Sequence, residues 1–201
     1  PPLSADALPC GTVLGGVTLA RVIGRGATAV VYGGLDIATQ TPRAVKVWHP
    51  QPGADEAAAR ERFLQEAQRT MDLAHPGIVR VFGGGTQAGL PFIVMELLAG
   101  RTLARYANAE QRLPEPLVLD IAAQLAEALA HAHRQGVLHR DVKPSNALFD
   151  LATRRAVLSD FGLARAPDAQ ASRSGVFMGS PLYMAPELLA GQPPDARSDL
   201  Y

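Results

Sequence analysis

Acidic and amide side chains that could bind a metal or accept a proton occur around positions 141 to 160. Asp141 and Asn146 lie close together with Lys143 between them, and Asp160 follows at the end of a predicted strand. Carboxylates accept protons, and together with amide oxygens they are ligands of hard cations. Carboxylates that face phosphate groups would repel them unless a cation lies between, so this set of residues implies Mg²⁺. Each aspartate alone can equally be a turn residue or a helix cap.

Lysine is rare in this chain. Of the 19 lysines and arginines only two are lysines, Lys46 and Lys143. Lysine is a compact point charge, whereas arginine is a broad planar fork, so this uneven use indicates two sites that need a compact charge. The pair points to phosphoryl transfer. Lys46 can also be read as a surface residue of an edge strand; if it is buried it needs a carboxylate, which Glu66 could supply.

A glycine turn lies near the start of the chain, at Gly24 and Gly26. Without a Cβ, such residues let backbone N–H groups approach phosphates. The same pair could be only a hairpin turn between strands. No helix is predicted directly after it, which argues against Rossmann or Walker-type phosphate sites.

Strands are predicted through most of the first half of the chain, because apolar residues alternate there and glycines or prolines separate the runs. A helix is predicted from an N-cap at Asp55 to about Met71. The predicted strands cover residues 12–23, 29–37, 43–48, 78–82 and 92–97. In the third strand, Ala44, Lys46 and Trp48 should share one face.

The second half is predicted to be mainly helical beyond Gly100, a residue read as a hinge. Apolar residues recur at every fourth position from Leu117 to Leu129, with prolines before them and Gly136 after them. Short strands are expected at 137–138, 147–149 and 156–159, followed by a long irregular stretch from 164 to 181. His131 and His133 point in different directions on the helix and are predicted to be ordinary helix residues.

Composition excludes several classes of protein. The 19 acidic and 19 basic residues cancel, so no field attracts nucleic acid or an anionic membrane. The single cysteine, Cys10, excludes an internal disulfide and a cysteine-built metal site. No apolar run is long enough to cross a bilayer, and we expect a cytoplasmic domain, whose parent protein could still be anchored through a segment outside this chain.

Taken together, the motifs resemble those of the eukaryotic-like protein kinases in type and order, with bacterial serine/threonine kinases the most similar. The resemblance runs from about residue 15 to residue 201. It rests on the glycine turn, on Ala44-Val45-Lys46, Glu66 and the stretch His139–Asn146, and on Asp160-Phe161-Gly162 and Ala185-Pro186-Glu187.

The implied fold is α+β with two lobes. An N-terminal extension (1–14) precedes an N-lobe (15–98), which has five antiparallel strands and one helix. A helical C-lobe (99–201) follows. It is incomplete, since the stretch 195–201 resembles the start of the helix that anchors the catalytic loop. The family pairs Glu187 with an arginine beyond that point, so Glu187 is expected to lack a partner here.

The resemblance implies a serine/threonine kinase that uses ATP and Mg²⁺, with a nucleotide-binding pseudokinase as the alternative. Asp141 would orient the substrate hydroxyl or accept its proton, Lys143 would steady the phosphate, and Asn146 and Asp160 would hold magnesium. Lys46 would pair with Glu66 and hold the α- and β-phosphates. Around the nucleotide the family places Ile23, Gly24, Gly26, Val31, Ala44, Lys46, Met95, Glu96, Leu98 and Leu148.

Regulation and partners are also implied. Arg140 before Asp141 is typical of kinases controlled by activation-loop phosphorylation, with Ser172 and Ser174 as candidate acceptors. Either serine could equally be an exposed loop residue. Ser180 fits the hydroxyl position that accompanies serine/threonine specificity. The expected partners are protein substrates and a second kinase domain for autophosphorylation.

Overall fold

The computed structural model describes residues 8–26, 28–49, 56–161 and 181–201. The chain forms two compact units. The first contains Pro1–Asp72 and Arg80–Leu98, and the second contains Leu73–Val79 and Ala99–Tyr201.

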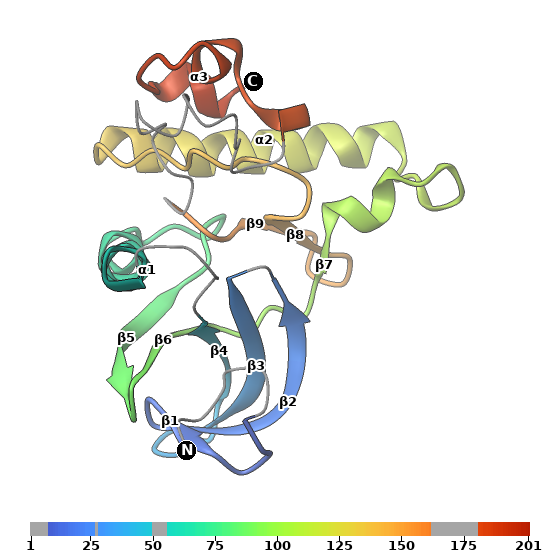
Figure 1. The fold of residues 1–201 in the computed structure, drawn as a ribbon. Helices are drawn as coiled ribbons and strands as arrows, with labels where there is room; N and C mark the ends of the chain where they lie inside the picture. The colour runs from blue at the N-terminus through green and yellow to red at the C-terminus, as the bar shows by residue number, and fades with distance from the viewer. Residues whose placement is uncertain (1–7, 27, 50–55, 162–180) are drawn as a thin grey trace. The chain divides into compact units, whose positions relative to one another are not determined.

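An antiparallel sheet of six strands, in the order β1-β2-β3-β4-β6-β5, dominates the first unit (Figure 1). Its strands are β1 (Val13–Leu14), β2 (Val17–Arg25), β3 (Ala29–Asp36), β4 (Pro42–Trp48), β5 (Val81–Gln87) and β6 (Leu90–Glu96). The hairpin between β5 and β6 turns at Ala88 and Gly89, both with positive φ, as a two-residue type I′ turn requires.

The two faces of this sheet bury different apolar clusters. Val45 and Val47 of β4 belong to a core that also contains Tyr32. Trp48 instead packs with Phe63, on the opposite face. Alternate residues of a strand point to opposite faces, so the prediction that Ala44, Lys46 and Trp48 share a face agrees with this division.

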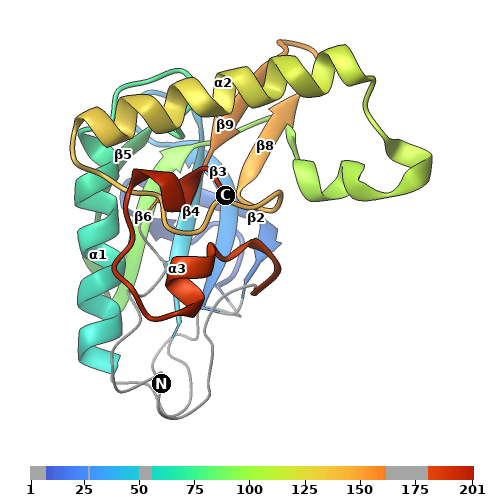
Figure 2. The ribbon, with the colours of Figure 1, turned by 90° about the horizontal axis from the view of Figure 1, so that it is seen from above.

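Helix α1 (Glu56–Met71) covers the Trp48 face and lies along β5 and β6 (Figure 2). Phe63 and Ala67, one turn apart, are its buried apolar contacts. The helix ends at Met71, as predicted, while the predicted N-cap Asp55 lies outside the described residues.

Two predicted strands of the first unit differ from the structure. The strand predicted for 12–23 is split by Gly15 and Gly16, both with positive φ, which adds the short strand β1 to the five expected. The strand predicted for 78–82 is displaced to β5, which continues through Gly83-Gly84-Gly85. Ile78 instead forms a parallel bridge with Leu158 in the second unit.

The second unit combines a three-stranded sheet with a long helix. Strands β7 (Arg101–Thr102), β8 (Ala147–Asp150) and β9 (Arg155–Leu158) pair in that order. Short helices complete the unit: η2 (Leu103–Ala107), η3 (Ala109–Gln111), η5 (Pro181–Tyr183), α3 (Pro186–Leu189) and η6 (Ala196–Asp199).

Helix α2 (Glu115–Arg134) packs across the sheet of the second unit (Figure 2). Pro114 is its N-cap, and Gly136, with φ +73°, follows its C-cap at Gln135. Ile121 and Leu129, from the predicted apolar stripe, are buried against β8 and β9 residues. The helix therefore begins and ends close to where the proline and glycine signals predict.

One predicted strand of the second unit is wrong, and Gly100 has a further structural role. Residues 137–138 are not a strand, because the Val137 N–H donates to the Ala132 carbonyl and closes the end of α2. Gly100, predicted to be a hinge, also lies very close to the backbone of β8. A Cβ there would lie 2.6 Å from the Phe149 carbonyl group, so only glycine allows β8 to approach this closely.

Candidate active site

Sheet register brings several predicted nucleotide-binding residues of the first unit together. Gly24 of β2 lies opposite Val31 of β3, which in turn lies opposite Lys46 of β4. Ala44 lies two residues before Lys46 and opposite Met95 of β6. Paired residues of antiparallel strands share a face, so the five positions occupy one face of the sheet.

Lys46 is buried, with only 7% of its surface exposed. Its ammonium lies 5.9 Å from the centre of the Phe63 ring, on the face that α1 covers. This burial argues against a surface lysine on an edge strand, since β4 lies between β3 and β6. Glu66 belongs to α1, but its side chain lies outside the described part of the chain.

The remaining predicted positions of this unit lie on β2 and β6 or directly after them. Ile23 of β2 is 43% exposed, and the Gly26 N–H donates to the Ala29 carbonyl, closing the glycine turn. Glu96 ends β6 and Leu98 follows it; both are partly buried.

In the second unit, polar contacts gather on one carboxylate oxygen of Asp141. The Lys143 ammonium lies 2.6 Å from Asp141 Oδ2, and Asn146 Nδ2 donates to the same oxygen at 2.8 Å. Asn146 Nδ2 also donates to the Asp141 backbone carbonyl at 2.8 Å. These contacts fix the Asp141 carboxylate, whose side chain keeps 22% of its surface exposed.

The β8–β9 ladder brings the two predicted metal ligands close to each other. Ala147 pairs with Leu158, and one step further the Ser159 N–H donates to the Asn146 carbonyl at 2.9 Å. Asp160 follows directly, with φ +63°, a left-handed conformation that aspartate tolerates better than most residues. Leu148 lies on β8, with its neighbours Ala147 and Phe149 buried in the core.

Asp199, which no sequence motif marked as a functional residue, binds the backbone directly before Asp141. Its Oδ2 accepts from the His139 N–H at 2.8 Å and its Oδ1 from the Arg140 N–H at 2.7 Å. His133 Nε2 donates to Oδ2 at 2.8 Å, and the Asp199 side chain is 1% exposed. The two bonds from backbone N–H groups connect the 195–201 stretch to the segment before Asp141 through one buried carboxylate in η6.

His139 is neutral by virtue of its bonding. Its Nε2 lies 2.9 Å from the Ser159 carbonyl, which can only accept, and its Nδ1 lies 3.2 Å from the Asp141 N–H, which can only donate. Burial lowers the pKa of the ring further, although Asp199 nearby opposes the shift. The ring also packs against Phe161, with centroids 4.5 Å apart. His139 therefore supports the loop as a neutral ring that bonds to the Ser159 carbonyl and the Asp141 N–H.

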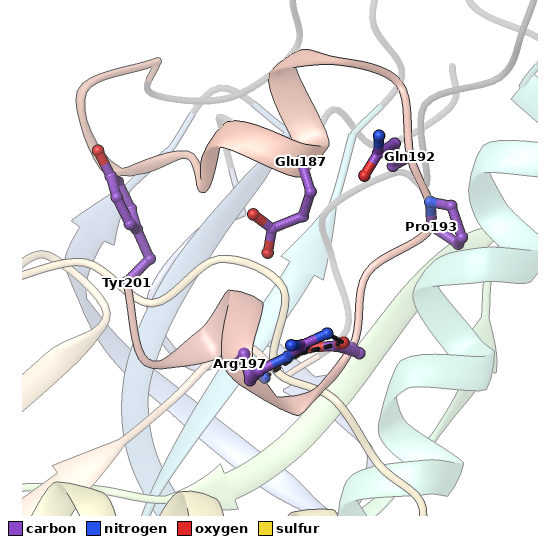
Figure 3. Close-up of a pocket in the computed structure, with 6 residues that line it drawn as sticks. Glu187, Gln192, Pro193, Arg197 and Tyr201 are labelled. Carbon is purple, nitrogen blue, oxygen red and sulfur yellow. Dashed lines mark hydrogen bonds and ion pairs between the residues drawn. The ribbon is translucent and has the colours of Figure 1, made fainter.

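Glu187 has a partner, contrary to expectation. Its carboxylate accepts from the Ser198 hydroxyl, and this bond is the main cause that lowers the pKa of Glu187. A pocket of about 470 Å³ adjoins these residues (Figure 3). Its lining residues are Glu187, Gln192, Pro193, Asp195, Arg197 and Tyr201. The arginine partner implied by the family stays a prediction.

The predicted phosphorylation sites Ser172 and Ser174 lie outside the described residues, as do Gly162 and Ser180. Among the residues that the structure describes, no three His, Cys, Asp or Glu side chains gather into a metal site. The predicted magnesium ligands are a different set, one carboxylate and one amide. Asn146 uses its amide nitrogen toward Asp141, which leaves its carbonyl oxygen as the ligand atom, so the donor chemistry fits a hard cation.

Comparison with known proteins identifies the family. The model of the protein kinase domain matches residues 17–201. This chain belongs to the protein kinase domain family. The crystal structure of the PknI kinase domain from Mycobacterium tuberculosis superposes with a TM-score of 0.75 at 32% identity, covering 96% of this chain and 73% of that one. PpkA in its apo form, 23% identical with a TM-score of 0.83, shares the fold.

Curated relatives of this protein kinase domain are bacterial serine/threonine-protein kinases. RqkA of Deinococcus radiodurans, named a DNA damage-responsive kinase, is 41% identical over 95% of this chain, and PknB of Mycobacterium leprae is 36% identical over 91%. The chain spans 29% and 30% of the length of these two relatives. None of the helices in the described ranges is long and apolar enough to cross a membrane.

Proposed function

We propose that this chain is the catalytic domain of a protein serine/threonine kinase that transfers the γ-phosphate of ATP to protein substrates. The observation that carries the proposal is the Asp141 carboxylate, held by Lys143 and Asn146 through one oxygen. Its position next to the ladder that leads to Asp160 fits the catalytic loop of the family.

Asp141 is proposed to orient the substrate hydroxyl. Oδ2 is engaged by two donors, so Oδ1 is the atom that would accept the hydroxyl proton. As the hydroxyl oxygen bonds to phosphorus, the bond between the γ-phosphorus and the bridging oxygen breaks and ADP leaves. Lys143, beside Asp141, would face the negative charge on the transferring group.

Magnesium would be held by Asn146 and Asp160, with phosphate oxygens as further ligands, and would neutralise phosphate charge. In the first unit, the shared face of Gly24, Val31 and Lys46 is proposed to bind the nucleotide. Lys46 would contact the α- and β-phosphates from its buried position.

The expected control by phosphorylation of Ser172 or Ser174, and the pairing of two kinase domains for autophosphorylation, remain parts of this proposal. A cytoplasmic location is proposed with them. The first relatives are several times longer than this chain, so substrates and partners of the whole protein are left to experiment.

Radiolabelled ATP and the full-length protein test the proposal. Transfer of label to serine or threonine should require a divalent cation and should be lost in Asp141→Asn. Asp120→Asn, an exposed carboxylate of α2 that contacts Arg154, is the matched control and should keep activity. Nucleotide binding by a folded protein that transfers no phosphate would overturn the proposal in favour of a pseudokinase scaffold.

A further inference from the structure

His75 closes a tight turn at the edge of the second unit. Its Nδ1 accepts from the Gly77 N–H at 3.0 Å, and its backbone carbonyl accepts from the Ile78 N–H at 3.0 Å. The same segment is bonded to the end of β9. The Leu158 N–H donates to the Gly77 carbonyl, and the Val79 N–H donates to the Leu158 carbonyl, both at 2.8 Å. The His75 turn therefore holds segment Leu73–Val79 in register with β9.

The Gly77 bond defines the protonation state of His75. A backbone N–H can only donate, so Nδ1 must carry a lone pair and the ring proton must be on Nε2. A second proton has only Nδ1 as its site. It would break the bond and place two N–H groups against each other at 3.0 Å. The turn as built is compatible only with neutral His75.

The surroundings on α2 add to this preference. The His131 ring lies 5.0 Å from the His75 ring, and His131 and Arg134 both oppose a positive charge on His75. Glu127 favours that charge. On the β9 side, Arg155 Nε donates to the Pro76 carbonyl at 2.7 Å and brings another cation to the turn. Burial is the largest cause that lowers the pKa of His75, and His131 is the next.

Packing leaves the turn little room to adapt. Gly77 is so close to α2 that a Cβ would lie 2.9 Å from the Ala128 methyl group. The next residue, Ile78, is 1% exposed and belongs to the core cluster that contains Leu158 and Phe161. Protonation of His75 therefore removes the bond from the Gly77 N–H to the ring, and a segment that has lost this bond should open from β9 more often.

We propose that His75 is a pH-sensitive latch, which holds segment Leu73–Val79 on β9 at neutral pH and releases it when the imidazole is protonated. Leu158 ends β9 two residues before Asp160, so the release would loosen the strand that leads to this predicted magnesium ligand. The proposal concerns the fold of the second unit and does not depend on catalytic activity.

Linkage between protonation and opening determines how the stability of the closed state depends on pH. A histidine with a lowered pKa in the closed state stabilises that state above its ordinary pKa of about 6.5, and this stability is lost as the pH falls below it. For one such group, the equilibrium constant for opening should rise by up to about tenfold between pH 7.5 and pH 5.5.

Hydrogen–deuterium exchange of the full-length protein at the two pH values measures this opening. Protection of residues 73–79, corrected for the intrinsic exchange rate at each pH, should fall by up to about tenfold in the wild type. His75→Asn should abolish most of that change, because the asparagine Oδ1 can accept the same N–H two residues on and does not titrate. Strand β4, in the other unit, is the internal reference.

A second measurement keeps the proposal testable if His75→Asn does not fold. Histidine NMR of the wild-type protein should show His75 with its proton on Nε2 and a titration midpoint below about 6.5. His131→Gln removes the neighbouring imidazole, which opposes protonation of His75, and should raise that midpoint. A His75 midpoint at or above the ordinary value, or unchanged protection of residues 73–79 down to pH 5.5, would overturn the latch.

Discussion

A substitution at Asp199 tests how the backbone before Asp141, the proposed catalytic residue, is held in place. Asp199→Asn keeps the shape of the side chain but replaces one acceptor oxygen with an NH₂ group. The carboxylate accepts from the His139 N–H, the Arg140 N–H and His133 Nε2, at 2.7 to 2.8 Å. The asparagine oxygen can keep the bonds from the His139 N–H and His133 Nε2. The amide nitrogen then faces the Arg140 N–H, which loses its acceptor.

These contacts give an estimate of the free energy of unfolding that Asp199→Asn loses. One buried N–H left without an acceptor costs about 1–3 kcal/mol, and the other two bonds lose their charge assistance, which is worth about 1 kcal/mol more. We therefore expect Asp199→Asn to lower the free energy of unfolding by about 2–4 kcal/mol. Arg140, held at φ +66° by the lost bond, should relax and displace the adjacent Asp141.

Displacement of a catalytic group by about 1 Å can cost on the order of 10²-fold in rate. We expect kcat of the full-length Asp199→Asn protein to fall by at least about tenfold, with KM for ATP within about twofold. Most of the predicted nucleotide-binding residues belong to the first unit, which is why KM should be spared.

Urea unfolding followed by circular dichroism, with steady-state kinetics, gives both quantities. Asp195→Asn is the matched control: it lies in the same turn but is exposed and pairs with Arg197, so its effect should be much smaller. An Asp199→Asn protein that loses less than about 0.5 kcal/mol and keeps wild-type kcat would refute the reasoning.

Three further predictions follow from other contacts. Lys46→Met removes a buried cation and should weaken Mg·ATP binding, measured by calorimetry, by at least about tenfold; unchanged affinity would contradict the assigned role. Gly34→Ala places a Cβ 2.3 Å from a backbone carbonyl of β2 and should lower the free energy of unfolding by about 1–3 kcal/mol, measured by urea titration. The control Gly83→Ala, where a Cβ has no atom within 4 Å, should change that free energy by less than about 0.5 kcal/mol. Ser198→Ala should raise the pKa of Glu187 toward its ordinary value in an NMR titration, and an unmoved pKa would show that the hydroxyl is not its cause.

Helix ends, strand faces and short polar motifs were predictable from the sequence, because residues close in the sequence determine them. The position of α2 follows from Pro114 and Gly136 together with the four-residue apolar period. The alternation from Ala44 to Trp48 predicts which face of β4 carries Lys46, because strand geometry depends on few other residues. Asp141, Lys143 and Asn146 are brought together within one short segment, so their spacing already indicates a shared site.

Predictions failed where distant segments compete for the same backbone. Ile78 has the pattern of a strand in the first unit, yet its segment bonds to Leu158, eighty positions away. Val137 is equally apolar, but its N–H is taken by the end of α2. The bond between Ser198 and Glu187 was not predictable from the sequence, because the two residues are eleven positions apart and the path of the chain between them brings the side chains together.

The sequence by itself indicated the family, the proposed reaction and the residues expected to act on phosphate, since these depend on residue types and short spacings. Tertiary structure decided which groups support them. His133 reads as an ordinary helix residue until folding brings it to Asp199, and Asp199 reads as a loop carboxylate until it meets the backbone at His139 and Arg140. The physical reason is burial: a carboxylate excluded from water must find donors, and only the folded chain specifies where those donors are.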